Sequence, residues 1–308
     1  MINRALIRLK IVQIVYAYYQ NGNKNLDATE KELLFSISKA YDLYNYLLLL
    51  MVNLTDYALK RIENAKLKKL ATPDDLNPNM RFVENKFAAQ LQVNAMLNDY
   101  ANRQKRSWFD HEDFLKQLYE KIQTSDIYKE YMAMPSSTYA IDREFWRKLY
   151  KTFIYGNADL DNLLEELSLY WNDDKEIVDT FVLKTINRFD EANGADQPLL
   201  PEFKDDEDRN FAIRLLRRSI LNCDEYRRLI SDNTRNWDLN RVAFMDVVIM
   251  QVALAEILSF SNIPISVTLN EFVEIAKYYS TPKSGAFVNG TLDGIVKKLK
   301  REGKIIKK

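Results

Sequence analysis

Apolar residues recur every three or four positions along most of the chain, the spacing that gathers them on one face of an α-helix. Residues 4–20 show this pattern first, in Leu6, Ile7, Ile11, Ile14, Val15 and Tyr18. The same spacing predicts further helices over residues 28–70, as one helix or two, and over residues 82–106 and 110–131. Residues 71–78 and Ser107 interrupt it, and residues 134–142 form a loop that leads into another helix. We therefore predict an all-α protein with no sheet of more than two short strands.

Two more helices are predicted near the C-terminus, after Pro264 and after Pro282, because proline rarely continues a helix. Thr268 and Glu271 have the spacing of a capping box, which predicts that the first of these helices starts there. The second keeps its apolar period through Asn289 and Gly290, so we interpret this pair as helical. Gly290 would then admit close approach of a neighbouring helix.

An internal repeat relates residues 142–183 to residues 208–249 without a gap, at an offset of 66. The matched pairs are Asp142 and Asp208, Arg143 and Arg209, Phe145 and Phe211, Leu149 and Leu215, Ile154 and Ile220, Trp171 and Trp237, Val182 and Val248, and Leu183 and Ile249. We predict that residues 142–189 and 208–257 superpose as similar helical units. Residues 193–208, rich in Pro, Gly and acidic side chains, are the predicted linker.

Composition limits the function. The 308 residues hold 44 basic and 44 acidic side chains, so any binding of nucleic acid must be local. With 7 glycines, the chain has no GxGxxG or Walker pattern. The single cysteine, Cys223, fits a reducing cytoplasm, and the single histidine, His111, excludes a His-rich metal cluster. No secretory signal opens the chain, and the apolar run of residues 46–52 is too short for a membrane span. A cytoplasmic protein is expected.

The C-terminal tail, residues 297–308, is rich in basic residues: it contains seven of them and one acidic residue. Such a tail is either a solvated helix end, favoured by the helix dipole, or a contact for phosphate groups. The sequence leaves both interpretations open.

Two stretches resemble the NusB family of bacterial transcription antitermination factors. In the opening helix Arg4, Arg8, Gln13 and Tyr16 fall on the family's pattern, whereas Ala5 replaces a usual arginine. The second stretch, residues 208–296, ends in the Asn-Glu, Ala-Lys and Phe-Val-Asn-Gly blocks of the family signature. Its other matching positions are Trp237, Arg241, Asp246, Ala253 and Glu256. Gln251 replaces a common arginine, and Lys283 stands where many members carry an acidic residue.

The resemblance implies a NusB-like helical bundle enlarged by an inserted helical bundle. Family members are usually less than half as long, so we expect a NusB-like first helix over residues 1–21, an inserted region over 22–205 that includes the repeat copy 142–189, and a NusB-like C-terminal domain over 206–308.

The resemblance also implies a non-catalytic role, without cofactor or metal. It implies binding of boxA-type single-stranded RNA from ribosomal RNA leaders, together with the ribosomal protein NusE and RNA polymerase. Cations hold phosphates and aromatic rings stack on bases in such sites. The expected RNA-binding residues are Arg4 and Arg8, on one exposed face, with Gln13, Tyr16 and Phe287. Asp246 is the expected partner-binding residue. Core packing remains the alternative for Tyr16 and Phe287.

Two other functions stay open. One is a helical protein-interaction module that retains the NusB fold without RNA binding, an interpretation that the thinned arginines and the large insertion favour. The other is an RNA cytosine methyltransferase, since the same helical domain is fused to such enzymes. That enzyme would need a Gly-rich strand–loop–helix and a catalytic cysteine, whereas Cys223 lies inside a helical block.

Overall fold

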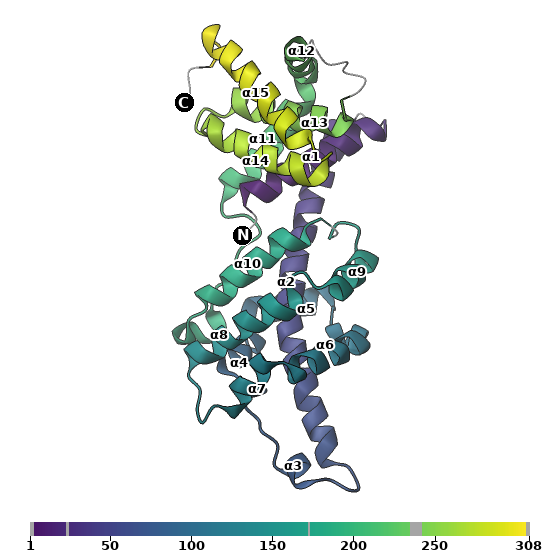
Figure 1. Cartoon of the computed structure of the whole chain (residues 1–308), viewed down its shortest axis with the longest axis vertical. Helices are drawn as coiled ribbons and strands as arrows, with labels where there is room; N and C mark the ends of the chain where they lie inside the picture. The colour runs from purple at the N-terminus through teal and green to yellow at the C-terminus, as the bar shows by residue number, and fades with distance from the viewer. Residues whose placement is uncertain (1–2, 23–24, 172, 235–241, 306–308) are drawn as a thin grey trace. The chain divides into compact units, whose positions relative to one another are not determined.

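The computed structural model describes residues 3–22, 25–171, 173–234 and 242–305. Every regular element in these ranges is a helix, and they contain no strand (Figure 1). The predicted all-α class is confirmed. In the same ranges no helix is long and apolar enough to cross a membrane.

The chain divides into two compact units. Unit 1 holds residues 39–202, and unit 2 holds residues 2–38 together with 203–308. Helix α2, Leu26–Lys66, contributes residues to both, and its 41 residues form the one long helix of the two alternatives predicted for residues 28–70. The predicted domain boundaries at residues 21/22 and 205/206 stay a prediction.

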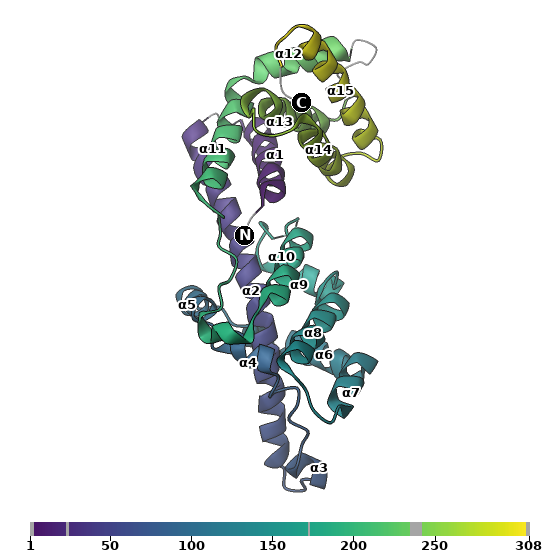
Figure 2. The same cartoon turned by 90° about the vertical axis from the view of Figure 1, so that its left-hand side faces the viewer.

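Unit 2 is built around one helix that is buried on nearly every side. That helix, α13, is rich in Val, Ile, Leu and Ala, and only residues near its ends are half-buried while the rest are buried. It packs against α1, α11, α12, α14 and α15 (Figure 2). The bounds are α1 Arg4–Gln20, α11 Asp206–Leu221, α12 Cys223–Asn233, α13 Phe244–Ser259, α14 Ile265–Tyr279 and α15 Ser284–Arg301.

Two local predictions in this unit are wrong. Helix α14 begins at Ile265, directly after Pro264, so Thr268 lies within it instead of capping it. The Thr268 side chain is buried and is used elsewhere, as described below. Helix α15 does run through Asn289 and Gly290, but a Cβ placed on Gly290 would meet nothing within 4 Å. Gly285 is the crowded position, where an added Cβ would lie 2.7 Å from the Lys277 side chain.

Unit 1 packs shorter helices around the C-terminal part of α2. Their bounds are α3 Pro73–Leu76, α4 Lys86–Gln92, α5 Ala95–Gln104, α6 Glu112–Thr124, α7 Asp126–Ala133, α8 Tyr139–Leu149, α9 Ala158–Leu167 and α10 Lys175–Arg188. A π-helical turn, Tyr150–Ile154, extends α8, and 3₁₀ turns cover Trp108–His111 and Glu191–Asp196. Aromatic rings fill part of the core, where Tyr46 stacks on Trp108 and Trp171 at centroid distances of 4.2 and 5.7 Å.

Two helices predicted as continuous are each divided in this unit. The helix predicted over residues 82–106 becomes α4 and α5, because the Asn94 side chain accepts a hydrogen bond from the Leu97 backbone N–H and starts a new helix. The helix predicted over residues 110–131 becomes α6 and α7, where Ser125 caps α7 in the same way. Asparagine and serine favour such caps over helix interiors.

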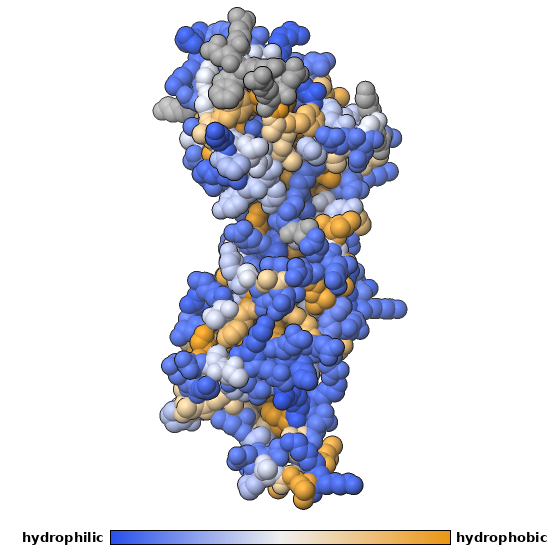
Figure 3. Space-filling view, turned by 45° about the vertical axis from the view of Figure 1, so that its right-hand side comes forward, coloured by the Kyte–Doolittle hydropathy of each residue, from blue (hydrophilic) through white to orange (hydrophobic). Residues whose placement is uncertain are grey.

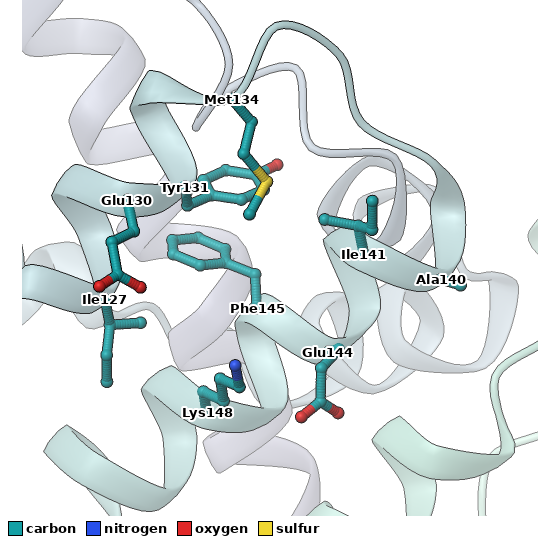
Figure 4. Close-up of a pocket in the computed structure, with 9 residues that line it drawn as sticks. All are labelled: Ile127, Glu130, Tyr131, Met134, Ala140, Ile141, Glu144, Phe145 and Lys148. Carbon is teal, nitrogen blue, oxygen red and sulfur yellow. The ribbon is translucent and has the colours of Figure 1, made fainter.

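Two apolar surface features lie in unit 1. A pocket of about 380 Å³ opens between α7 and α8, where the rings of Tyr131 and Phe145 stack at 3.7 Å (Figure 4). Where α2 ends and α3 follows, Leu67, Leu70 and Leu76 are 82%, 91% and 54% exposed, and hydrophobic atoms gather at the bottom of the view in Figure 3. Nothing in the described residues identifies what covers either feature.

The helices of the predicted repeat occur in the same order. Helices α8, α9 and α10 fall, at the 66-residue offset, on α11, α12 and α13. The matched positions Phe145 and Phe211 are both buried, as are Leu149 and Leu215. Trp171 is fully buried, but its predicted counterpart, Trp237, lies outside the described residues. The duplication therefore stays a prediction.

Candidate nucleic-acid interface

Helix α1 carries four of the five predicted RNA-binding residues. Asn3 starts the helix by accepting a hydrogen bond from the Leu6 backbone N–H at 3.0 Å. The helix then packs against α11, α13 and α14, and residues 6–12 are all buried. A helix enclosed to this degree leaves little of its surface for a ligand, so the polar side chains within it must find partners inside the protein.

Arg4 lies at the edge of this enclosed region and is paired with two acids. Its Nε donates to Asp208 at 2.8 Å and its guanidinium donates to Glu207 at 2.7 Å. The same guanidinium lies 4.9 Å from the centroid of the Phe211 ring. Partial burial acts to lower the pKa of Arg4, but the hydrogen bonds to Glu207 and Asp208 outweigh it and raise that pKa. An RNA phosphate would have to compete with these two carboxylates.

Arg8 is buried, so the prediction that it lies on the surface is wrong. Its side chain is 4% exposed and forms two hydrogen bonds with the Glu256 carboxylate, at 2.7 and 3.0 Å. Glu256 also accepts from the Thr268 hydroxyl at 2.7 Å, and Glu271 lies 3.6 Å from Arg8. We call Arg8, Glu256, Thr268 and Glu271 the buried ion network. It joins α1, α13 and α14, and its geometry is that of a structural ion pair.

Tyr16 and Gln13 lie on the half-buried side of α1. The Tyr16 ring packs 5.5 Å from Phe244, in a tilted arrangement, which supports the core-packing alternative for part of its surface. The nearby Tyr19 hydroxyl accepts a hydrogen bond from Gln251 at 3.0 Å, and burial raises the pKa of Tyr19 to about 12. Tyr19 thus remains a neutral phenol at physiological pH.

Gln251, which replaces an arginine common in the family, joins three helices. Its amide nitrogen donates to the Ser219 carbonyl at 2.7 Å as well as to Tyr19, and its oxygen accepts from Arg227 at 3.0 Å. The Arg227 guanidinium covers the Tyr19 ring at 4.2 Å. A cation therefore remains in this region, supplied by α12 instead of α13.

Asp246, in the first turn of α13, is buried, with 4% of its surface exposed, and its side chain contacts the start of α15. Its carboxylate accepts a hydrogen bond from the Ser284 hydroxyl at 2.8 Å, and that hydroxyl also accepts from the Thr281 backbone N–H at 3.0 Å. Phe287 follows one turn later and is half-buried. Asp246 therefore orders the helix end that carries Phe287, and its predicted contact with a partner stays a prediction.

The structure places the predicted RNA-binding residues on α1 and α15 and Asp246 on α13, against which both of those helices pack. Sequence reasoning missed the buried ion network because its members are distant in sequence: Arg8 and Glu256 are 248 positions apart. One signal was available. Arg8 and Lys10 stand inside an otherwise apolar helix, where a charge needs a partner. The described residues hold no group of three or more His, Cys, Asp or Glu arranged to bind a metal.

Comparison with known proteins identifies the family of this framework. A model of the NusB family matches residues 178–297. The transcription antitermination protein NusB of Salinibacter ruber is 36% identical over 132 residues, which span 41% of this chain and 82% of that protein. The NusB of Chloroherpeton thalassium is 39% identical over 95 residues, 31% of this chain and 45% of that protein.

A solved structure of T. maritima NusB is 32% identical, covers 47% of this chain and 90% of its own, and has a TM-score of 0.31. The range 178–297 that the family model matches includes α13, α14 and most of α15, the helices that carry Glu256, Thr268 and Phe287. On the identity and coverage of the Salinibacter ruber protein, together with the family match, this chain belongs to the NusB family.

Proposed function

We propose that this protein is a non-catalytic transcription antitermination factor that binds boxA-type RNA of ribosomal RNA leaders together with the ribosomal protein NusE and RNA polymerase. Its membership of a family whose relatives are named transcription antitermination proteins carries the proposal. The partial exposure of Gln13 and Tyr16 on α1 and of Phe287 on α15 supports it, because each of these side chains keeps part of its surface available to a ligand.

Within this function the residues take different roles. Gln13 offers a donor and an acceptor to a base edge, and Tyr16 and Phe287 offer ring faces for stacking. Arg4 contributes a weak phosphate contact, because Glu207 and Asp208 already hold it. Arg8 contributes through the fold, by holding α1 against α13 and α14. Asp246 acts on the partner surface by ordering the start of α15.

A titration with labelled boxA-type RNA, with and without NusE, tests the proposal. Two modules that bind one RNA gain from effective concentration, so we expect NusE to tighten RNA binding at least about tenfold, or ~1.4 kcal/mol of coupling. A scrambled RNA of equal length is the control for specificity. If the protein binds neither RNA while it binds NusE, the helical interaction module without RNA binding becomes the better assignment.

The residue roles are tested with Phe287→Ala and Tyr16→Ala. Loss of one stacked base is expected to cost ~1–3 kcal/mol of RNA affinity. A thermal melt of each variant separates weaker base stacking from weaker packing within the protein. Equal RNA affinity of both variants and the native chain would move the base contacts away from these two rings.

A further inference from the structure

A second basic site lies in unit 2, away from the enclosed face of α1. It is a pocket of about 410 Å³ walled by α11, α12, the end of α13 and the segment around α15. Arg214, Arg218 and Lys304 line it, against a single carboxylate, that of Glu225. Glu302, which pairs with Lys304, adds a second carboxylate beside the pocket, so the three cations exceed the acids around them by one.

The three cations of this pocket differ in how firmly they are held. Arg214 donates to the Ser259 carbonyl at 2.6 Å and covers the Phe260 ring at 4.7 Å. Arg218, one helical turn further along α11, is exposed and has no hydrogen bond or ion pair from its side chain within the described residues. Lys304 is exposed and pairs at 2.8 Å with Glu302, whose side chain is 37% exposed. An exposed pair of this kind is worth little and is readily exchanged for a stronger anion.

Part of the wall behind these cations is apolar, because Leu258 and Leu299 line the pocket beside Tyr226, which is almost fully buried. Low-dielectric walls strengthen the attraction between a cation and an anion held against them. Guanidinium groups match the oxygens of a phosphate in a bidentate geometry. On charge and donor type, the pocket suits a phosphate group.

The arginines of α1 are less available to an RNA phosphate than the cations of this pocket. Arg4 already contacts two carboxylates, and Arg8 belongs to the buried ion network. A phosphate at these positions must displace a partly or fully buried acid, whereas in the pocket Arg218 has no acidic partner among the described residues and Lys304 shares only an exposed pair with Glu302. We propose that this pocket holds a phosphodiester group of the bound RNA, as a backbone contact separate from the base contacts of α1 and α15. This inference rests on the proposed RNA binding.

The test uses the full chain with Arg218→Gln combined with Lys304→Gln, because both side chains are exposed and neither change should alter the fold. We expect RNA affinity to fall by about three- to tenfold at low salt. The slope of log affinity against log salt should also fall, by about 0.7 for each phosphate of single-stranded RNA that the variant no longer neutralises. A phosphate contact carries no base information, so boxA-type and scrambled RNA should lose affinity by the same factor.

The matched control is Lys31→Gln combined with Arg228→Gln. These two cations are also exposed in unit 2, do not line the pocket, and remove the same total charge. The control should keep the native salt slope, and Arg218→Lys should keep most of the affinity because the charge remains.

The outcomes separate this inference from the proposed function. If the native chain binds RNA and the pocket variant binds it with unchanged affinity and slope, the pocket holds no phosphate. An equal loss in the control variant would also overturn the assignment, since bulk charge would then explain the effect. If the native chain binds no RNA, the proposed function is wrong, and the phosphate assignment, which rests on it, is wrong as well.

Discussion

Each unit packs one helix against the first helix of a predicted repeat copy, and the contacts that hold this helix differ between the two units. In unit 2, α1 packs on α11; in unit 1, α4 packs on α8. Asn3 caps α1 and Asn85 caps α4. The acids at matched repeat positions face these helix starts: Asp208 accepts from the Arg4 side chain at 2.8 Å, and Asp142 accepts from the Lys86 backbone N–H at 2.9 Å.

The next turn of α1 and of α4 shows the same difference in the partners of the side chains. Arg8 lies four residues after Arg4 and binds the Glu256 carboxylate. Gln90 lies four residues after Lys86 and donates to the backbone carbonyls of Asp190 and Gly194, at 2.8 and 3.0 Å. Asp190 and Glu256 are again 66 positions apart. This packing arrangement is thus held by ion pairs between side chains in unit 2 and by hydrogen bonds to backbone groups in unit 1.

The largest expected effect comes from breaking the ionic version. Glu256→Gln leaves the Arg8 guanidinium buried without its charge partner, which is expected to lower the free energy of unfolding by about 3–5 kcal/mol. Urea denaturation measures the change. The control in unit 1 is Gln90→Ala, which removes neutral hydrogen bonds and should cost about 1–3 kcal/mol. Equal losses from the two variants would remove the contrast.

A smaller difference is expected between the two matched acids. Asp142 is 1% exposed and also accepts from the Tyr131 hydroxyl at 2.7 Å, so Asp142→Ala should cost about 1–3 kcal/mol of stability. Asp208 pairs with the partly exposed Arg4, which keeps Glu207 as a second partner. Asp208→Ala should therefore cost no more than about 1 kcal/mol. The reverse order in thermal melts would contradict this expectation.

The two units also differ in a buried titratable group. At the 66-residue offset, Asp179 in unit 1 corresponds to Met245 in unit 2, which cannot titrate. Burial raises the pKa of Asp179 to about 6, although hydrogen bonds from Lys175 and Tyr150, both at 2.6 Å, act to lower it. The folded chain therefore binds more protons than the unfolded chain between about pH 4 and pH 6. The contribution of Asp179 to the free energy of unfolding falls as pH rises through this window and is constant above it.

This contribution is measured as the difference between the native chain and Asp179→Asn across that pH range. The difference should change by up to about 1.4 kcal/mol for each pH unit. Lys129→Gln, a change at an exposed side chain in unit 1, is the control. A pH-independent difference between the native chain and Asp179→Asn would show that Asp179 stays ionised throughout.

The smallest effect is expected for Arg4→Gln on RNA affinity. Glu207 and Asp208 already neutralise this cation, so we expect a loss of about twofold or less, below that of the Arg218 and Lys304 double variant. A titration at matched salt measures both. A larger loss for Arg4→Gln would restore α1 as the main phosphate contact.

Elements and their buried faces could be predicted from the sequence wherever the apolar period was long, as in α1 and α2. Divisions such as α4 from α5 could not, because one capping asparagine, Asn94, competes with an unbroken apolar period. The candidate site was predicted less well than the fold.

Arg4 pairs with Asp208, which is 204 positions away in the sequence, and the Thr268 hydroxyl donates to Glu256 instead of capping its own helix. Periodicity describes the face of one helix, whereas these partners depend on how helices pack.

The pairing of Arg8 with Glu256 also has an evolutionary consequence. A substitution at either position alone leaves the other charge buried without its partner. The two residues can therefore be replaced only together or through a single variant of low stability. A descendant of this chain that no longer bound RNA at all would still be selected to keep Arg8. An arginine at this position of the first helix therefore reflects selection for folding. Exposed cations such as Arg218 can be substituted without loss of stability once binding is no longer under selection.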